Sequence, residues 1–425
     1  MVVLLLSIMV GFLILGFPML LSMIIAPLAV LLNYFPNIKP ELLIQMLISG
    51  VSPFVLLAVP MFIFAADIMS KGQMADRLLN LVKSFVGHIH GGLAITAGGT
   101  CTIFGAISGS TQATLVAIGK PMFKPMFQAG YNVSHVIALL MNNANLALLI
   151  PPSICMIMYC VVTGVSVGEL FMAGFAPGLL LFAAFASYDY FYARYKKIKT
   201  TRKATWKERL IAFKKAILPL GFPALVLGGI YTGKFSPTEA AAASALYATI
   251  LEVFIYKSLK FKDFPKIALS TGLVTASVFI LIAGGQAFSW VITYAQIPQM
   301  LTAGVLGADP SALRVLVMIS LFFFVSCMFV DSIPVIIILT PIFYPVAIKA
   351  GVDPIHLGII VTLQSAIGCV TPPFGCNIFT ACGIFNKPFL TVVRGLFPYM
   401  LINIIMAIIF VLFPAITLLS RNLLY

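Results

Sequence analysis

Two stretches of the sequence, LLIPPS at 148–153 and VTPPFGCNIF at 370–379, each place two consecutive prolines inside a long hydrophobic segment. Proline removes a backbone N–H group and clashes with the preceding helical turn, and it disfavours the helical conformation of the residue before it. A helix that contains Pro151-Pro152 or Pro372-Pro373 should therefore unwind, which leaves carbonyl groups without their helical partners. Either motif alone could be a packing kink that neighbouring helices satisfy, but two at matching places favour a binding site.

The composition indicates the environment of these helices. Of the 425 residues, 61% are hydrophobic and only 9% are charged, whereas charged residues make up about 25% of an average soluble domain. This excludes an ordinary soluble enzyme, a disordered protein and a nucleic-acid-binding module. Because a membrane-spanning helix needs about 20 apolar residues, the sequence predicts an all-α polytopic membrane protein.

The distribution of charge predicts the orientation in the membrane. The net charge is +14, and ten of the 26 basic residues lie between Arg194 and Lys215, opposed only by Glu208. Basic residues collect in cytoplasmic loops, so we expect residues 194–215 to form a cytoplasmic loop. Counting crossings from this loop places the N-terminus in the cytoplasm and Tyr425 in the periplasm.

Nine apolar segments are long enough to span the membrane, and the first is expected to be a retained helix because no basic region precedes it. They cover residues 2–32, 42–69, 132–165, 167–192, 211–231, 238–257, 267–306, 354–385 and 388–420. Two further apolar regions, 92–127 and 312–348, carry polar or helix-breaking residues at their centres. Each is expected to be a re-entrant hairpin, because non-helical backbone is tolerated in the membrane only where protein or a wet cavity surrounds it.

A window of about 50 residues in the first half aligns without a gap with the second half when it is shifted by 221 residues, and Pro121 and Pro125 match Pro341 and Pro345 at a shift of 220. The shift places Ala129-Gly130 on Ala350-Gly351, His135 on His356, Pro151-Pro152 on Pro372-Pro373, Gly174 on Gly395 and Pro177 on Pro398. The two hairpins are expected to open from opposite sides of the membrane. The sequence therefore predicts inverted-topology repeats, each with one re-entrant hairpin and one Pro-Pro broken helix.

We expect a first sodium site where the first hairpin tip meets the first broken helix, because hydroxyl, amide and freed carbonyl oxygens gather there. Its predicted ligands are Ser108, Ser110, Thr111, Asn145, Leu148 and Ile150. Asn142 and Asn143 lie in the same helix as Asn145, and amides at such positions can also join neighbouring helices.

A second sodium site is expected at the second tip, where Asp331 is the one acid of its hairpin. An acid within the membrane is a functional candidate, and Asp331 could be a sodium ligand, a proton carrier or the partner of a distant arginine. The predicted ligands are Asp331, Ser332, Gly368, Cys369 and Thr371, with Gln364 and Ser365 offering further oxygens nearby. The substrate is expected between the two sites, at Ser108, Gly109, Asn145, Ser332 and Thr371.

The remaining polar residues receive structural interpretations. Asp67 and Asp189 lie near predicted membrane ends, where water can solvate them, and Ser236 and Glu239 have capping-box spacing. The seven cysteines are expected to be small, reduced core residues rather than disulfides or metal ligands. The sequence contains no Walker A, HExxH or GxSxG motif, so we expect neither an ATP-driven pump nor an enzyme.

At these residues the chain resembles the large membrane subunit of a tripartite ATP-independent periplasmic (TRAP) transporter. The resemblance covers essentially the full length. It rests on FGAISGSTQAT (104–114), LLIPPS, SPTEAAA (236–242), FVDSIPVIIILTPIF (329–343) and VTPPFGCNIF. It implies a sodium gradient as the energy source, an elevator-type movement and a place in the lipid of the bacterial inner membrane. It also implies three partners: a small four-helix membrane subunit, expected as a separate chain; a periplasmic binding protein; and an organic acid anion such as a C4-dicarboxylate, sialic acid or another sugar acid.

The resemblance also implies a division of the chain into domains. Residues 92–165 and 307–387 would form the two halves of a transport domain, residues 1–91 and 166–306 the scaffold, and residues 388–425 a final membrane helix. Sodium would be the one metal bound, and no nucleic acid is expected. A standalone sodium–carboxylate symporter is one alternative, which the SPTEAAA and DSIPV motifs disfavour. A related antiporter that uses Asp331 as a proton site is the other.

Overall fold

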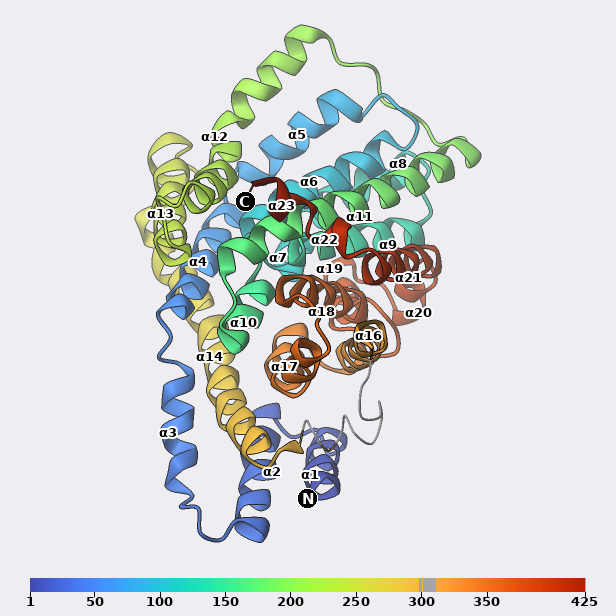
Figure 1. Cartoon of the computed structure of the whole chain (residues 1–425). Coiled ribbons are helices and arrows are strands. Elements are labelled where there is room, and N and C mark those ends of the chain that lie inside the picture. The colour runs from blue at the N-terminus through green and yellow to red at the C-terminus, as the bar shows by residue number, and fades with distance from the viewer. Residues whose placement is uncertain (298–299, 301–310, 425) are drawn as a thin grey trace.

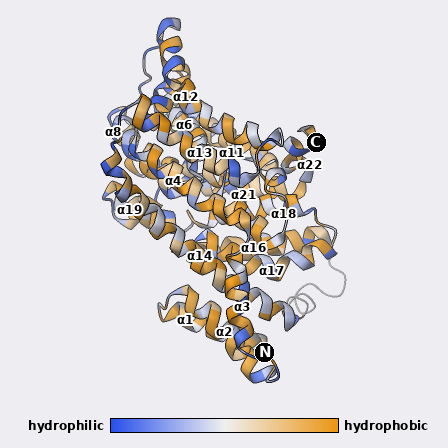
Figure 2. Ribbon diagram, turned by 90° about the vertical axis from the view of Figure 1, so that its left-hand side faces the viewer, coloured by the Kyte–Doolittle hydropathy of each residue, from blue (hydrophilic) through white to orange (hydrophobic). Residues whose placement is uncertain are grey.

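The computed structural model describes residues 1–297, 300 and 311–424, and every regular element within them is a helix (Figure 1). Seven helices are long and apolar enough to cross a membrane, which confirms the polytopic membrane class. They are Phe54–Lys71, Val167–Tyr195, Trp206–Tyr231, Pro237–Ile255, Phe261–Tyr294, Ala312–Phe329 and Ser332–Lys349. Figure 2 shows that hydrophobic residues predominate along the central helices and that hydrophilic segments lie at the periphery, among them the end near α12.

The first half contains a helical hairpin followed by a broken helix. The hairpin consists of α6 (Gly92–Ser108), a tip at 109–110, then α7 (Thr111–Thr114), the π-helical turn η2 (Leu115–Gly119) and α8 (Lys120–Gln128). Gly109 has a φ of 57°, which suits glycine at this sharp reversal. The broken helix consists of α9 (Val133–Ala144), η3 (Asn145–Leu148) and, after the prolines, α10 (Ile154–Thr163).

The second half repeats this order. Its hairpin is α16 (Ala312–Phe329) and α17 (Ser332–Lys349), and its broken helix is α18 (Pro354–Gly368) and α19 (Cys376–Phe385). The repeat extends to single caps: Asn132 and Asp353, 221 residues apart, each accept hydrogen bonds from backbone amides in the first turn of α9 and α18. Both Pro-Pro bonds are cis. The breaks therefore occur at the two predicted places.

The N-terminal spans differ from the prediction of single helices. Residues 2–32 divide into α1 (Val2–Ile14) and α2 (Met19–Tyr34), separated by Gly16 with a φ of 75°. Residues 42–69 divide at Pro53 into α3 (Glu41–Gly50) and, after the turn η1 (Phe54–Leu57), α4 (Ala58–Lys71). Hydropathy alone could not reveal either division because the turn residues lie within continuous apolar sequence.

The remaining helices support these two units. Elements α5 (Met74–Val86), α11 (Val167–Tyr195), α12 (Trp206–Tyr231), α13 (Pro237–Thr249), η4 (Ile250–Ile255), η5 (Phe261–Asp263) and α14 (Phe264–Tyr294) follow in order. Helix α14 packs against α2, α3 and α4 and also against α17, and α13 packs against α4. Ser236 and Glu239 form the predicted capping box at the start of α13, with reciprocal hydrogen bonds of 3.3 and 2.7 Å.

The C-terminal region is more divided than expected. Residues 388–425 contain α20 (Phe389–Val393), α21 (Phe397–Leu412), α22 (Pro414–Thr417) and α23 (Leu419–Leu424) in place of one final helix. Pro398 and Pro414 each lie in the first turn of a helix, where proline is tolerated. The end of the predicted span 267–306 and the domain boundary at 306/307 lie outside the described residues.

Candidate functional site

Both hairpin tips open onto one cavity of about 620 Å³. The first tip contributes Ser108, Ser110 and Gln112, and the second contributes Asp331. The opposite wall comes from α4 and α14. Its polar members are Asp67, Ser70 and Ser277, and its apolar members include Ile63, Val274, Val278 and Leu281. The cavity thus lies between the two hairpins and the helices that the sequence assigned to the scaffold.

The first tip is folded tightly by its own hydroxyl groups. The Ser108 and Thr114 hydroxyl oxygens lie 2.8 Å apart, and the Thr114 hydroxyl donates a hydrogen bond of 2.9 Å to the Ser110 carbonyl. Ser110 caps α7. A Cβ atom on Gly109 would lie only 2.7 Å from the carbonyl oxygen of Pro152. The first tip therefore contacts the first Pro-Pro break, as the sequence predicted.

The second tip contacts the second break through sulfur. The Ser332 hydroxyl lies 3.0 Å from the Cys369 thiol, and the Cys376 thiol donates a hydrogen bond of 3.1 Å to Asp331 Oδ1. Asp331 is the N-terminal cap position of α17, and Ser110, 221 residues earlier, is that of α7. The two tips thus occupy equivalent places but present different chemistry, hydroxyl groups in the first half and a carboxylate beside thiols in the second.

A polar bridge connects the two broken helices. The Asn377 side chain donates a hydrogen bond of 2.7 Å to Asn145 Oδ1, and Asn145 donates one of 2.6 Å to the carbonyl of Ala366. The Thr111 hydroxyl donates to Asn377 Oδ1 at 3.1 Å. Both amides are buried. Asn377 was not among the predicted site residues, although an amide within the apolar helix that follows a break was a usable signal.

The carbonyl groups at the breaks are more fully paired than expected. The Gly368 carbonyl accepts a hydrogen bond from the Thr371 amide, and the Cys369 carbonyl accepts one from the Asn377 amide, both of 3.0 Å. The Thr371 hydroxyl turns back to the Ile367 carbonyl. In the first half, the Ile150 side chain packs against Gly178 of α11, and Leu148 is buried. Their roles as sodium ligands remain predictions.

Of the residues predicted to bind substrate, the cavity wall includes Ser108. The other members, Gly109, Asn145, Ser332 and Thr371, are not among its lining residues and make the contacts described above. The wall instead contains residues that the sequence had not indicated, Asp67, Ser70, Gln112 and Ser277. Their helices come from distant parts of the chain, so local patterns could not place them together.

The interpretation of Asp189 as solvated at a membrane end was wrong, whereas Asp67 is half-buried near the C-terminal end of α4. Asp67 lines the cavity and accepts a hydrogen bond of 2.9 Å from the Thr271 hydroxyl of α14. Asp189 is only 1% exposed. It accepts a hydrogen bond from the Tyr399 hydroxyl and lies 3.6 Å from His135 Nε2. Asp67 thus belongs to the site, and Asp189 belongs to a buried polar cluster.

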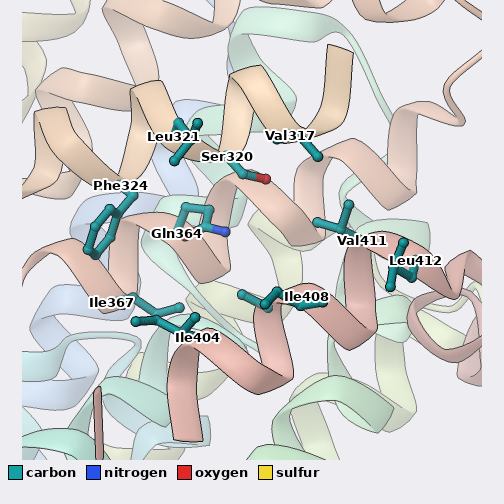
Figure 3. A pocket seen from close by; sticks show the side chains of 11 residues that line it. Val317, Ser320, Leu321, Phe324, Gln364, Ile367, Ile404, Ile408, Val411 and Leu412 are labelled. Carbon is teal, nitrogen blue, oxygen red and sulfur yellow. The ribbon is translucent and has the colours of Figure 1, made fainter. Parts of the chain in front are cut away.

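Gln364 does not join the second tip. It lies in a separate apolar pocket of about 340 Å³ between α16, α18 and α21. Figure 3 shows its amide among the side chains of Ser320, Phe324 and Ile408. Gln364 lies only one helical turn before Gly368, so it is close to the break in the sequence. Its side chain nevertheless points to the side of α18 that faces this apolar pocket.

The charge of the side chains that line the cavity indicates which ligands it can bind. Two carboxylates, Asp67 and Asp331, lie in its wall, and the described residues that line it include no lysine, arginine or histidine. Hydroxyl and amide groups make up the rest of its polar surface. Such a wall can bind cations directly, and its two carboxylates repel an anion unless positive charge compensates them.

Comparison with known proteins identifies relatives over nearly the whole chain. A family model described as the DctM component of the tripartite ATP-independent periplasmic transporters matches residues 6–416. The chain is 50% identical to the ectoine TRAP transporter large permease protein TeaC of Halomonas elongata, over 98% of this chain and 97% of that protein. It is 49% identical, with the same two coverages, to the ectoine/5-hydroxyectoine TRAP transporter large permease protein UehC of Ruegeria pomeroyi.

More distant matches extend the comparison. The C4-dicarboxylate TRAP transporter large permease protein DctM of Pseudomonas aeruginosa is 37% identical over 87% of this chain and 86% of that protein. Among solved structures, the YdaH transporter of Alcanivorax borkumensis superposes with a TM-score of 0.60 at 15% identity, over 88% of this chain and 87% of that one. The last match shows a shared fold alone.

Proposed function

This chain belongs to the tripartite ATP-independent periplasmic transporters as their DctM component, and we propose that it uses a sodium gradient to import a small zwitterionic carboxylate of the ectoine class. It is a polytopic membrane component of a transporter, not an enzyme. In the proposal, a periplasmic binding protein delivers the substrate, and a small membrane subunit completes the assembly.

The charge of the cavity wall carries this choice of substrate. Ectoine combines one carboxylate with a cationic amidine, whereas a C4-dicarboxylate carries two negative charges. At an effective dielectric constant of about 20, a substrate carboxylate about 5 Å from Asp67 would be repelled by roughly 3 kcal/mol. An amidinium group at the same place would be attracted. The wall thus favours a zwitterion over the dianions and sugar acids named from the sequence resemblance.

The identity of the relatives supports the same choice. The two proteins that are about 50% identical to this chain are named for ectoine transport, and the one named for C4-dicarboxylates is 37% identical. In the proposed complex, the amidinium faces Asp67. The substrate carboxylate faces the hydroxyl groups of Ser108 and Ser110 and a sodium ion held near them.

Sodium supplies the positive charge that the wall lacks. The first tip offers hydroxyl oxygens, the type of ligand that hard cations prefer. Interrupted helices at matching places in two halves of a transporter commonly hold coupling ions. A sodium ion beside Ser108 would balance the substrate carboxylate, so each would strengthen the binding of the other. This mutual dependence is the physical basis of the proposed coupling.

The position of the cavity supports an elevator-type movement. Its walls come from both proposed units: Ser108 and Asp331 belong to the transport-domain segments 92–165 and 307–387, while Asp67 and Ser277 belong to the scaffold segments. A substrate bound at this boundary could move with the hairpins past α4 and α14. The carboxylate of Asp67 would then contact the substrate at one end of the movement.

The proposal is tested by uptake into proteoliposomes that contain the chain with its small subunit. Radiolabelled ectoine and succinate are compared, each with and without an inward sodium gradient and with and without the binding protein. We expect ectoine uptake that needs both the gradient and the binding protein. Uptake of succinate without ectoine would contradict the substrate proposal. Equal ectoine uptake without binding protein would instead indicate a standalone symporter, and uptake driven by pH alone would indicate an antiporter.

A further inference from the structure

The second hairpin tip gathers soft metal ligands from three segments of the chain. Asp331 is the residue before α17, Cys369 follows the last residue of α18, and Cys376 is the first residue of α19. One carboxylate oxygen and the two sulfur atoms all lie within 4.8 Å of one another. The sequence had indicated only that these cysteines are reduced core residues, and both are free thiols in the structure.

The ligand types decide which cation this cluster would take. Thiolates bind zinc and other soft or borderline metals, whereas hard cations such as sodium prefer oxygen. Tetrahedral zinc with bonds of about 2.3 Å to sulfur and 2.0–2.2 Å to oxygen holds its ligand atoms roughly 3.5–3.8 Å apart. The observed spread therefore needs only small side-chain movements, and the Ser332 hydroxyl, 3.0 Å from the Cys369 thiol, is a further oxygen beside the cluster.

The cluster is accessible from the cavity. Asp331 is part of the cavity wall, and Gln112, another wall residue, directs its side-chain amide to the Cys376 sulfur at 3.9 Å. Cys369 is fully buried behind them. A metal ion that entered the cavity would thus meet the carboxylate first and the inner thiol last.

We propose that Asp331, Cys369 and Cys376 form a site for a zinc-type divalent cation that fixes the second hairpin tip to the second broken helix and stops transport. Binding converts the two thiols to thiolates and releases their protons to solvent. The metal then links α17 to both sides of the Pro-Pro break. An ion or substrate held between this tip and the break then cannot be released by movement of the tip, so transport stops even though the hairpin and its broken helix belong to the same proposed moving unit.

The first half of the chain lacks an equivalent set of three metal ligands. At the position of Asp331 it has Ser110, and at the position of Cys369 it has Leu148. Inhibition should therefore act at one tip alone. The inference is defined by the ligand atoms and does not depend on which substrate or ion is transported, so metal binding can be measured apart from uptake.

The primary test is cadmium binding to the purified complex of this chain and its small subunit, followed by the charge-transfer absorption of cadmium–thiolate bonds. We expect one strongly absorbing cadmium per chain. Cys369→Ser and Cys376→Ser should each weaken binding by at least about 10- to 100-fold, the loss caused even by removing residues that only support metal ligands. Cys382→Ser, six residues further along α19, is the matched control and should bind normally.

A second measurement connects binding to transport. In proteoliposomes that contain the complex and saturating binding protein, micromolar zinc should stop uptake, a chelator should restore it, and the Cys382→Ser control should respond in the same way. The Cys376→Ser variant should retain whatever uptake it has in the presence of zinc. Absence of the thiolate absorption, or its persistence in both ligand variants, would overturn the site. Binding without inhibition would overturn the proposed effect on the tip.

Discussion

Asn145 donates a hydrogen bond of 2.6 Å to the carbonyl oxygen of Ala366, the residue that lies 221 positions later and is its own equivalent in the repeat. Two equivalent residues can contact each other only where the two repeats meet closely. Asn377 extends this contact by donating to Asn145, and Thr111 of the first tip donates in turn to Asn377. The centre of the molecule is therefore a buried polar chain that joins both broken helices and one tip.

This chain of amides predicts a large effect of Asn145→Ala. The substitution leaves the Asn377 amide and the Ala366 carbonyl buried without partners, and each unsatisfied group costs about 1–3 kcal/mol. We expect a clear fall in the thermal midpoint of the purified complex. Asn33→Ala is the control, because the Asn33 amide is exposed and bonds only within its own helix. Equal midpoints for the two variants would show that the bridge does not hold the repeats together.

Contacts at the two ends of α11 bear on the predicted orientation of the chain in the membrane. Near the C-terminus, Arg421 forms ion pairs with Glu169 at the start of α11 and with Asp353 at the cap of α18, at 3.0 and 3.1 Å. The basic segment 194–215 begins at the other end of α11. This helix has 29 residues, so its ends are about 43 Å apart at 1.5 Å per residue, more than the thickness of the hydrocarbon core.

We therefore predict that Lys203 and Asn422 lie on opposite sides of the membrane, with Lys203 in the cytoplasm. Each is replaced by cysteine, and whole cells are treated with a membrane-impermeant maleimide. We expect labelling of N422C in intact cells and labelling of K203C only after the cells are opened. The unsubstituted chain controls for the native cysteines. Labelling of both variants from the same side would contradict the count of nine crossings.

The sequence predicted the parts of the site that depend on local chemistry. Pro151-Pro152 and Pro372-Pro373 break their helices wherever they stand, and Gly109 favours a sharp reversal, so both breaks and the first tip could be located. The roles of Asp67 and Asn377 could not be predicted in this way. Asp67 reaches Thr271, 204 positions away, and Thr111 reaches Asn377, 266 positions away. Such contacts depend on packing between helices, which no local pattern records.

Asp67 is predicted to select substrates by charge. Asp67→Asn keeps the shape of the side chain and an oxygen for the Thr271 hydroxyl, but removes the negative charge. Loss of a charge-assisted contact costs about 1.5–3 kcal/mol, which is roughly 10- to 150-fold in affinity. We expect the half-saturating concentration of ectoine, delivered by its binding protein, to rise by that factor.

The control for this prediction is Asp76→Asn, which changes an exposed carboxylate on α5. Its uptake curve should match that of the unsubstituted transporter. Normal ectoine affinity in the Asp67 variant, with normal amounts of protein in the membrane, would remove the amidinium contact from the proposed function. The Asp67→Asn variant should also tolerate a substrate carboxylate near position 67 better than the unsubstituted transporter does.

Sodium dependence is predicted to be sensitive to both tips, and most sensitive to Asp331. Ser108→Ala and Ser110→Ala each remove a hydroxyl oxygen from the cavity wall, and Asp331→Ala removes a charge. The loss of one charge-assisted ligand, about 1.5–3 kcal/mol, corresponds to roughly a 10- to 150-fold higher sodium requirement. Ser110 also caps α7, and the Ser108 hydroxyl also contacts the Thr114 hydroxyl, so each replacement lowers stability by about 1 kcal/mol as well. The measurement is uptake against sodium concentration at saturating binding protein, with Ser187→Ala, which changes an exposed hydroxyl on α11, as the control. Sodium curves that coincide for the Ser108, Asp331 and Ser187 variants, at equal amounts of folded protein, would place the coupling ions elsewhere, because a tip that holds sodium cannot lose its ligand oxygens without a change in sodium affinity.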